Sequence, residues 1–323
     1  MNVKILFILL SVALLCSCSN SRTNGTFFHE TKELYAEKIP VNEIFAPIWI
    51  TKTGNYLIIA SFKGDTTLFL YDIPSLSFKF ATGQKGGGPD DIATYPMFCN
   101  SHSDDYVYIR GYSHYSIRKI AIQPQGNFMF IDEYILKAND EYNHMNVIND
   151  SLLIYYNGEQ LAVKKYDLKK EALIKEIYLK KEDHRESYYY SNRGFVAVND
   201  SLIIFPYIYK KQIDIYNVDD LTLKIRIGDG KKPQRMKVYD DESIMYHYLS
   251  IYTGKNFFYV IYAGHKEKDD FSVRTLEVYD YDGNPVIKYT FDIIPFHFVV
   301  DEENGYIYGH NSNYEDYLLR YKL

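Results

Sequence analysis

The sequence repeats a unit of about 45–50 residues, and this repetition constrains the fold more than any other feature. The clearest copy spans residues 198–230 and reads VNDSLIIFPYIYKKQIDIYNVDDLTLKIRIGDG. Within it, short polar turns separate three runs of β-branched and aromatic residues, 201–207, 212–217 and 222–227. Such runs are typical of strands, so each copy is predicted to form consecutive antiparallel strands.

An aromatic residue followed by Asp or Asn ends the middle run of most copies and fixes the period. This landmark occurs at Tyr71-Asp72, Tyr166-Asp167, Tyr216-Asn217 and Tyr279-Asp280. Ile120 stands at this place in the second copy and Tyr321 in the sixth. Six copies of this length, each with several strands, match the blades of a propeller.

One more short apolar run precedes each copy and is predicted to be the innermost strand of its blade. These runs cover residues 47–50, 95–98, 145–148, 194–198, 246–252 and 295–300. The chain is therefore predicted to form an all-β, six-bladed β-propeller with four-stranded blades. A pair of β-sandwiches or a large barrel would also use short strands, but neither explains the repeat.

The sixth copy lacks an outermost strand, because the sequence stops at Leu323. A strand-like run at residues 34–41 has no blade of its own. An open sheet edge between the first and last blades would weaken the ring. We therefore expect residues 34–41 to supply the missing strand and to close the ring.

Composition agrees with an all-β fold and argues against a nucleic-acid binder. The chain holds 34 Tyr and 19 Phe, residues that favour strands, against one Trp. Its net charge is −6, which becomes −7 when residues 1–17, whose only charge is that of Lys4, are removed. An acidic protein with scattered lysines lacks the basic footprint of nucleic-acid binding, so no nucleic-acid partner is expected.

The N-terminus has the pattern of a lipoprotein signal peptide. Lys4 precedes an apolar run of 11 residues, 5–15, which is too short to span a bilayer and typical of a signal-peptide core. Leu15-Cys16-Ser17-Cys18 follows and resembles the bacterial lipobox, in which a small residue precedes the lipidated cysteine. Cys18 fits that cysteine. A plain secretory signal with incidental cysteines is the alternative.

The chain thus divides into a signal peptide (residues 1–17), a polar tether (18–30) and a propeller domain (31–323). We expect a lipid anchor on Cys18 to hold the protein in the cell envelope, at the outer membrane. The periplasmic side and the cell surface are both open as its location. Cys99 is the only other cysteine of the mature chain, so no disulfide is expected within it. A lone cysteine beside Phe98 is typical of a small core residue.

The segment Gly86-Gly87-Gly88-Pro89-Asp90-Asp91 adds a family resemblance to the lipobox and the six units. Together these features resemble the TolB-like six-bladed propeller lipoproteins of Bacteroidota, whose members often carry a G-x-G-P-x-[DE]-like loop after the first blade. The resemblance covers essentially the whole mature chain. It implies the propeller fold and an envelope location, and it implies no catalytic residues, because no catalytic motif of the family matches here.

The same glycine-rich segment is the first candidate site. A glycine-rich loop can cradle phosphate through its backbone N–H groups, but this needs a following helix or a Lys-Ser/Thr pair. Pro89, Asp90 and Asp91 follow here instead, which removes one donor and adds two negative charges. Two interpretations stay open: a tight connection between blades, or a loop that contacts a ligand.

A second candidate site combines His144, Arg193, His247 and His297, each just before or at the start of a predicted inner strand. Their blades could bring them together at one mouth of the central channel. Histidines arranged in this way can bind a metal or act as acid–base groups. No Asp or Glu partner is evident for any of them, and isolated histidines are often structural. No metal ion or other cofactor is therefore expected.

Aromatic and acidic segments give two further candidates. Tyr188, Tyr189 and Tyr190, with Arg185 and Arg193 nearby, have the composition of interfaces and sugar-stacking surfaces, or else pack between blades. Residues 280–284 and 301–305 carry carboxylates before glycine, as calcium loops do, but lack the twelve-residue loop with its terminal Glu. Their Asp-Gly and Asn-Gly pairs favour hairpin turns instead.

These features favour a propeller that binds an envelope protein or a glycan over one that catalyses a reaction. A rigid ring with variable loops suits recognition, and the sequence has no G-x-S-x-G motif for a serine hydrolase. The alternative is an enzyme at the channel mouth, such as a glycan lyase or a lactonase-like hydrolase, built on the histidines. Fold alone does not choose between these uses.

Overall fold

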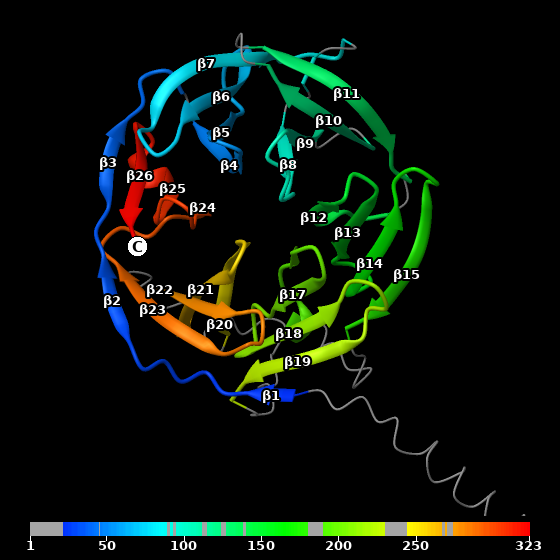
Figure 1. Cartoon of the computed structure of the whole chain (residues 1–323), viewed down its shortest axis with the longest axis vertical. Helices are drawn as coiled ribbons and strands as arrows, with labels where there is room; N and C mark the ends of the chain where they lie inside the picture. Colours follow the sequence, from blue (N-terminus) through cyan, green and yellow to red (C-terminus); the bar gives the residue numbers. More distant parts are fainter. Residues whose placement is uncertain are drawn as a thin grey trace, which may run out of the picture.

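A computed structural model of the chain describes residues 22–44, 46–88, 91–92, 95–111, 115–123, 127–137, 140–179, 190–229, 244–266, 269 and 274–323. Six sheets of mainly antiparallel strands lie around a central axis, each with its first strand innermost (Figure 1). The prediction of an all-β, six-bladed propeller with four-stranded blades is confirmed. The described residues also form two short 3-10 helices, η2 (Tyr190–Asn192) and η4 (Ser312–Tyr314). No helix in these ranges is long and apolar enough to cross a membrane.

Blades 1 to 3 are formed by consecutive strands, running outward from the axis. Blade 1 consists of β4 (Pro47–Thr53), β5 (Tyr56–Ser61), β6 (Thr66–Asp72) and β7 (Ser77–Gln84). Blade 2 consists of β8 (Pro96–Cys99), β9 (Tyr106–Gly111), β10 (Ser116–Ile122) and β11 (Phe128–Ile135). Blade 3 consists of β12 (Asn143–Ile148), β13 (Leu152–Asn157), β14 (Ala162–Asp167) and β15 (Ala172–Tyr178).

Blades 4 and 5 follow the same order, and blade 6 takes its last strand from the N-terminal part of the chain. Blade 4 consists of β16 (Ala197–Val198), β17 (Leu202–Pro206), β18 (Gln212–Asn217) and β19 (Leu223–Gly228). Blade 5 consists of β20 (Met245–Thr253), β21 (Phe257–Lys266), β22 (Thr275–Asp280) and β23 (Pro285–Phe291). Blade 6 consists of β24 (His297–Asp301), β25 (Tyr306–His310), β26 (Tyr317–Lys322) and β3 (Glu37–Pro40).

A β-bulge recurs at the landmark residue of the third strand. In blades 1, 3, 4 and 5 the register between the third and fourth strands shifts immediately before Tyr71, Tyr166, Tyr216 and Tyr279. In blade 2 the same shift precedes Ile120. All five side chains are buried. Because a bulge strengthens the local twist, its repetition gives these five blades a common shape at the landmark position.

Apolar side chains fill the spaces between neighbouring blades. Six clusters of buried residues occupy the six interfaces between adjacent blades. The inner strands also contact one another around the axis, from β4 through β8, β12, β16, β20 and β24 and back to β4. Cys99 lies in the cluster between blades 2 and 3, and burial raises its pKa to about 12. The prediction that Cys99 is a core residue is confirmed.

Three short strands before β4 run along the outer rim of blades 4, 5 and 6 (Figure 1). β1 (Arg22–Asn24) pairs parallel with β19, β2 (Thr31–Leu34) pairs parallel with β23, and β3 pairs antiparallel with β26. We call residues 22–40 the N-terminal belt. Through β3, the belt supplies the outermost strand of blade 6.

The belt differs from the sequence-based expectation in two respects. Residues 34–41 do not form one strand: β2 ends at Leu34 and β3 begins at Glu37. Between them the backbone N–H of Ala36 donates to Asp292 Oδ1 at 2.9 Å, where the chain passes from blade 5 to blade 6. In addition, residues 22–24 of the expected tether pair with blade 4. Asn24 is buried, and its amide donates to the carbonyl of Asp282 at 2.8 Å.

Candidate functional site: the central channel

Two adjoining cavities lie along the axis of the ring. The inner cavity has a volume of about 210 Å³ and is lined by residues in or next to all six inner strands. The outer cavity, of about 560 Å³, opens among the turns that follow five of these strands. Both are lined by Lys52, Ser101, His102 and Tyr252. The two cavities together, which we call the channel, are large enough for a small ligand or for the end of a larger one.

Aromatic rings form part of the wall of the inner cavity. Trp49, the only tryptophan of the chain, lies on β4 and faces His297 of β24, with ring centroids 4.5 Å apart. His144 meets Phe195 edge to face, with centroids 4.7 Å apart. Aromatic faces of this kind can stack on a flat or ring-shaped ligand. The channel therefore offers stacking surfaces at two places. One lies where blade 6 meets blade 1, and the other lies where blade 3 meets blade 4.

Lys52 is the positive charge shared by both cavities. Its side chain is 19% exposed, and Nζ lies 3.9 Å from Asp301 Oδ1. Asp301 is itself buried, and its Oδ2 accepts a hydrogen bond from Asn304 Nδ2 at 2.6 Å. At 3.9 Å the Asp301 carboxylate is too distant to be a close, charge-assisted hydrogen-bond acceptor for the ammonium. A ligand oxygen in the channel could provide such an acceptor.

His102 also belongs to the channel, although the sequence analysis did not select it. Its Nε2 lies 2.8 Å from the carbonyl oxygen of Val198, and the Thr253 hydroxyl donates to the same carbonyl at 2.7 Å. These contacts join the ends of the inner strands of blades 2, 4 and 5. The predicted channel residues all lie just before or at the beginnings of inner strands, whereas His102 follows the end of one. The same reasoning applied to their ends would have found His102, three residues after Cys99.

The structure places two of the four predicted residues together in the channel. His144 and His297 both line the inner cavity. Arg193 and His247 are instead attached to the backbone of Ile208 in blade 4: the carbonyl of Arg193 accepts from Ile208 N at 2.9 Å, and His247 N donates to the Ile208 carbonyl at 2.7 Å. Neither Arg193 nor His247 is among the lining residues of the two cavities.

Enclosure by protein lowers the pKa of all three predicted histidines. The ring of His144 reaches the water of the channel but is surrounded by the inner strands, and this desolvation lowers its pKa. Desolvation also lowers the pKa of His297. Desolvation, aided by the charge of Lys211, lowers the pKa of His247 to about 4. Desolvation therefore favours the neutral form of all three imidazoles.

Charged ligand sets for a metal ion are not found in the parts of the chain that the structure describes: no three His, Cys, Asp or Glu side chains gather there. The acidic segments form hairpin turns. Asp280 Oδ1 accepts from Asn284 N at 2.7 Å while Gly283 adopts a φ of 75°, and Gly305 N donates to the Asp301 carbonyl at 2.9 Å. The Asp280 carboxylate and the Asp301 carbonyl thus organise turns of the kind that Asp-Gly and Asn-Gly pairs favour.

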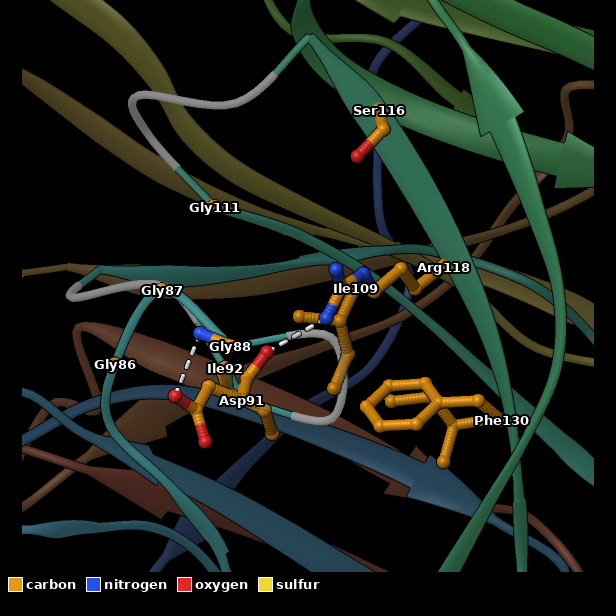
Figure 2. Close-up of a pocket in the computed structure, with 11 residues that line it drawn as sticks. Gly86, Gly87, Gly88, Asp91, Ile92, Ile109, Gly111, Ser116, Arg118 and Phe130 are labelled. Atoms are coloured by element: carbon orange, nitrogen blue, oxygen red, sulfur yellow. Dashed lines mark hydrogen bonds between the residues drawn. The ribbon is translucent and has the colours of Figure 1, made fainter.

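The glycine-rich segment folds around a carboxylate of its own (Figure 2). Gly88 N donates to Asp91 Oδ2 at 2.7 Å, and a Cβ at Gly86 would lie 2.1 Å from the same oxygen. Arg118 of blade 2 donates to the Asp91 carbonyl at 2.6 Å. Asp91 thus occupies the place that a phosphate would take, so these contacts favour the connection between blades. Pro89 and Asp90 lie outside the described residues.

Several predicted residues lie outside the part of the chain that the structure describes, namely Cys18, Arg185, Tyr188 and Tyr189. Tyr190 begins η2, and the next two residues, Ser191 and Asn192, are buried.

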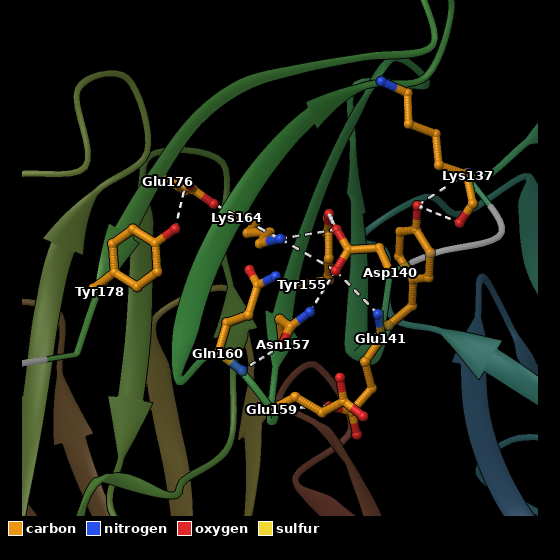
Figure 3. A network of polar contacts seen from close by, with 11 residues as sticks. Lys137, Asp140, Glu141, Tyr155, Asn157, Glu159, Gln160, Lys164, Glu176 and Tyr178 are labelled. Carbon is orange, nitrogen blue, oxygen red and sulfur yellow. Dashed lines mark hydrogen bonds and ion pairs between the residues drawn. The ribbon is translucent and has the colours of Figure 1, made fainter. Parts of the chain in front are cut away.

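Blade 3 contains a polar network that the sequence analysis missed (Figure 3). Asp140 accepts hydrogen bonds from the Tyr155 hydroxyl at 2.5 Å, from Lys164 Nζ at 3.0 Å and from Asn157 Nδ2. Burial raises the pKa of Asp140, but the hydrogen bonds from Tyr155, Lys164 and Asn157 outweigh this effect and hold the pKa below its ordinary value. The network ties the start of blade 3 to its second and third strands.

Equivalent positions in three consecutive blades hold buried ionisable side chains. Lys164, Asp214 and Glu277 each lie two residues before the landmark tyrosine, and all three are buried. Arg226 donates to Asp214 at 2.7 and 2.9 Å, and the Tyr279 hydroxyl donates to Glu277 at 2.7 Å. Asp214 is thus paired with an arginine of its own blade, whereas Glu277 accepts a hydrogen bond from a tyrosine while burial raises its pKa. These contacts indicate a structural role. The landmark tyrosine is the sequence signal from which this position can be found.

The comparisons with known proteins agree with this architecture. Residues 23–303 match the family model described as TolB-like 6-blade propeller-like. An exported protein of Bacteroides fragilis superposes with a TM-score of 0.60 at 12% identity, covering 93% of this chain and 98% of its own. A member of the DUF4221 family from Bacteroides vulgatus superposes with a TM-score of 0.59 at 13% identity, covering 90% and 97%.

No curated protein sequence is significantly similar to the chain. At these identities the two Bacteroides structures share the fold alone with it. The family model, in contrast, spans most of the sequence, including parts of all six blades. The chain therefore belongs to the TolB-like six-bladed propeller family.

Proposed function

We propose that the protein is a lipid-anchored propeller of the cell envelope that binds a protein or glycan partner in its central channel. The signal-peptide pattern before Cys18 supports export and a lipid anchor at the outer membrane. The similarity to a Bacteroides protein described as exported supports the same location. The observation that carries the binding role is the channel itself, which combines aromatic rings with the weakly paired ammonium of Lys52.

Recognition fits the channel better than catalysis because its histidines do not form an acid–base pair. The ring of His102 is bonded to a backbone carbonyl, and the pKa of His144 and of His297 is lowered by desolvation. A rigid ring can hold such groups in place for binding without reorganising them.

The emission of Trp49 tests this proposal, because the single tryptophan reports directly on the inner cavity. Oligosaccharides and peptides released from the envelope are titrated against the purified chain. We expect a saturable change in emission, and an affinity lower by about tenfold or more in Lys52→Ala. Lys79→Ala, on the exposed strand β7, is the matched control and should bind like the unchanged protein.

Equal binding by the two lysine variants, or an emission that no probe alters, would contradict a channel site. The enzyme alternative rests on His144 and His297 sharing the inner cavity. It predicts that a probe is converted to a product of different mass and that His144→Gln or His297→Gln abolishes the conversion. Binding without conversion supports the recognition role.

A further inference from the structure

The anchor leaves the propeller very little freedom, because the belt begins four residues after Cys18. Arg22 is already paired with Ile225 of β19. Four extended residues span at most about 14 Å. If Cys18 carries the lipid, as proposed above, the bilayer surface must lie close to the rim of blade 4. A free tether of residues 18–30 would have allowed any orientation, but the pairing of β1 and β2 removes it.

The start of β1 points toward blade 3. β1 runs parallel to β19, so its first residue, Arg22, is the one that lies nearest to the beginning of β19. The turn that precedes β19 lies against blade 3: Lys165 Nζ donates to the carbonyls of Val218 at 3.0 Å and Asp219 at 3.2 Å. The rim nearest to the anchor is therefore formed by the outer strands of blades 3 and 4, β15 and β19.

β15 carries an exposed apolar surface at this place. Leu173, Ile174 and Tyr178 are 42%, 49% and 52% exposed. The bulge in blade 3 contributes to this surface, because it leaves Ile174 without a partner on β14. On β19 no large apolar side chain is exposed. Among the described strands, none pairs with the outer edge of β15, whereas β1 and β2 cover the corresponding edges of blades 4 and 5.

We propose that Leu173, Ile174 and Tyr178, the blade 3 rim, lie against the bilayer that holds the Cys18 lipid. Apolar side chains, a tyrosine and a nearby lysine, Lys175 of the same strand, have the composition of interfacial anchors. The lipid and this rim then act as two attachment points on one side of the ring. The ring stands on its edge, and the axis of the channel runs along the membrane plane, so that both of its ends stay open to water.

Quenching by brominated lipids tests this orientation. A single tryptophan is placed by Tyr178→Trp in a Trp49→Phe background, and the acylated chain is reconstituted into vesicles of phosphatidylethanolamine and phosphatidylglycerol with brominated acyl chains. We expect its emission to fall roughly two-fold relative to unbrominated vesicles, as for a side chain at the depth of the headgroup boundary. Phe78→Trp on β7 of blade 1, which is 39% exposed, is the matched control and should keep its emission.

Hydrogen exchange on the acylated chain without substitutions provides the second measurement. The backbone amides of β15 should exchange more slowly when the chain is bound to vesicles than when it is not, whereas the exchange of the β7 amides should not change. If the acylated chain shows no quenching at position 178, or if quenching at position 78 equals that at position 178, this inference is wrong. The proposed function is not affected by either result. A chain that mass spectrometry shows to lack acyl groups on Cys18 overturns both. If the chain forms a dimer in detergent and Ile174→Lys dissociates it, β15 packs against a second copy of the chain. The inference would then be wrong.

Discussion

Gly86 shows how closely backbone and side chain approach in the glycine-rich loop. A Cβ at this position would lie 2.1 Å from Asp91 Oδ2, an oxygen that Gly88 N already holds at 2.7 Å. The carboxylate cannot move aside without losing that hydrogen bond. The role of this glycine is therefore to admit the Asp91 carboxylate, which fixes the connection between blades 1 and 2.

We predict that Gly86→Ala lowers the free energy of unfolding by about 1–3 kcal/mol, through overpacking and the loss of the Asp91 hydrogen bond. Gly87→Ala is the matched control, because a Cβ there would meet nothing within 4 Å. It should change the free energy of unfolding by less than about 0.5 kcal/mol. Urea denaturation of the two variants measures both values, and equal effects would show that Asp91 does not set the requirement for glycine.

His310 makes the stability of the protein sensitive to acid. It is 5% exposed, it pairs with His297 across β24 and β25, and neither of its ring nitrogens has a hydrogen-bond partner among the described residues. Desolvation, with a smaller contribution from His297, lowers its pKa to about 4. An unfolded histidine takes up its proton near pH 6.5. Between these two values the unfolded chain binds more protons, so stability falls as the pH decreases.

We predict that His310→Leu reduces this loss of stability, because leucine has no proton to gain. The free energy of unfolding of the unchanged protein should fall between pH 7 and pH 4.5 by on the order of 2 kcal/mol more than that of the variant. Urea denaturation at the two pH values measures the difference. Parallel pH profiles for the two proteins would exclude His310 as a source of the acid sensitivity.

At the scale of elements, the belt strands differ from all others because they pair with blades that are far from them in the sequence. β3 pairs with β26 from Tyr317↔Pro40 to Arg320↔Glu37, and Arg320 forms a salt bridge of 2.7 Å with Glu37. Leu34 and Val41, at the two ends of this region, are both 2% exposed. The outer edge of blade 6 and part of its packing therefore depend on residues that precede blade 1.

We predict that deletion of residues 31–41 lowers the melting temperature by on the order of 10 °C. Each buried aliphatic side chain contributes about 2 kcal/mol, and each kilocalorie shifts the melting temperature of a chain of this size by about 2–4 °C. Lys32→Ala, at a side chain that is 57% exposed, is the control and should melt like the unchanged protein. Circular dichroism measures both, and an unchanged melting temperature in the deletion would refute a stabilising role for β2 and β3.

Which elements the sequence could predict depends on the range of the interactions that form them. β18 has the bounds expected from the sequence, 212–217, because local turns and alternating apolar residues define it. The break between β2 and β3 could not be predicted in this way. It depends on Asp292, which lies 256 positions from Ala36 in the sequence.

At the scale of the whole molecule, the same limit applies to the channel. The position of His144 and His297 at the beginnings of inner strands indicated the axis correctly. Arg193 and His247 have similar positions in the sequence, but their backbones bond to Ile208 of blade 4, and neither residue lines the cavities. The proximity of Lys52 to Asp301 joins blades 1 and 6, which no local pattern records. A periodic sequence thus predicts which strand a residue occupies, but not which side chains of that strand line the channel.

The pairing of β3 with β26 also has a consequence for the order of events during synthesis. Arg320 and Glu37 are 283 positions apart, so the ribosome releases one of them long before the other exists. Until β26 emerges, β3 has no edge to join, and contacts so distant in sequence form slowly. Blade 6 can therefore be completed only after β26 has been synthesised, since the paired residues lie 283 positions apart. A prematurely terminated product would expose an unpaired strand, which proteases and chaperones could use to distinguish it from a finished molecule.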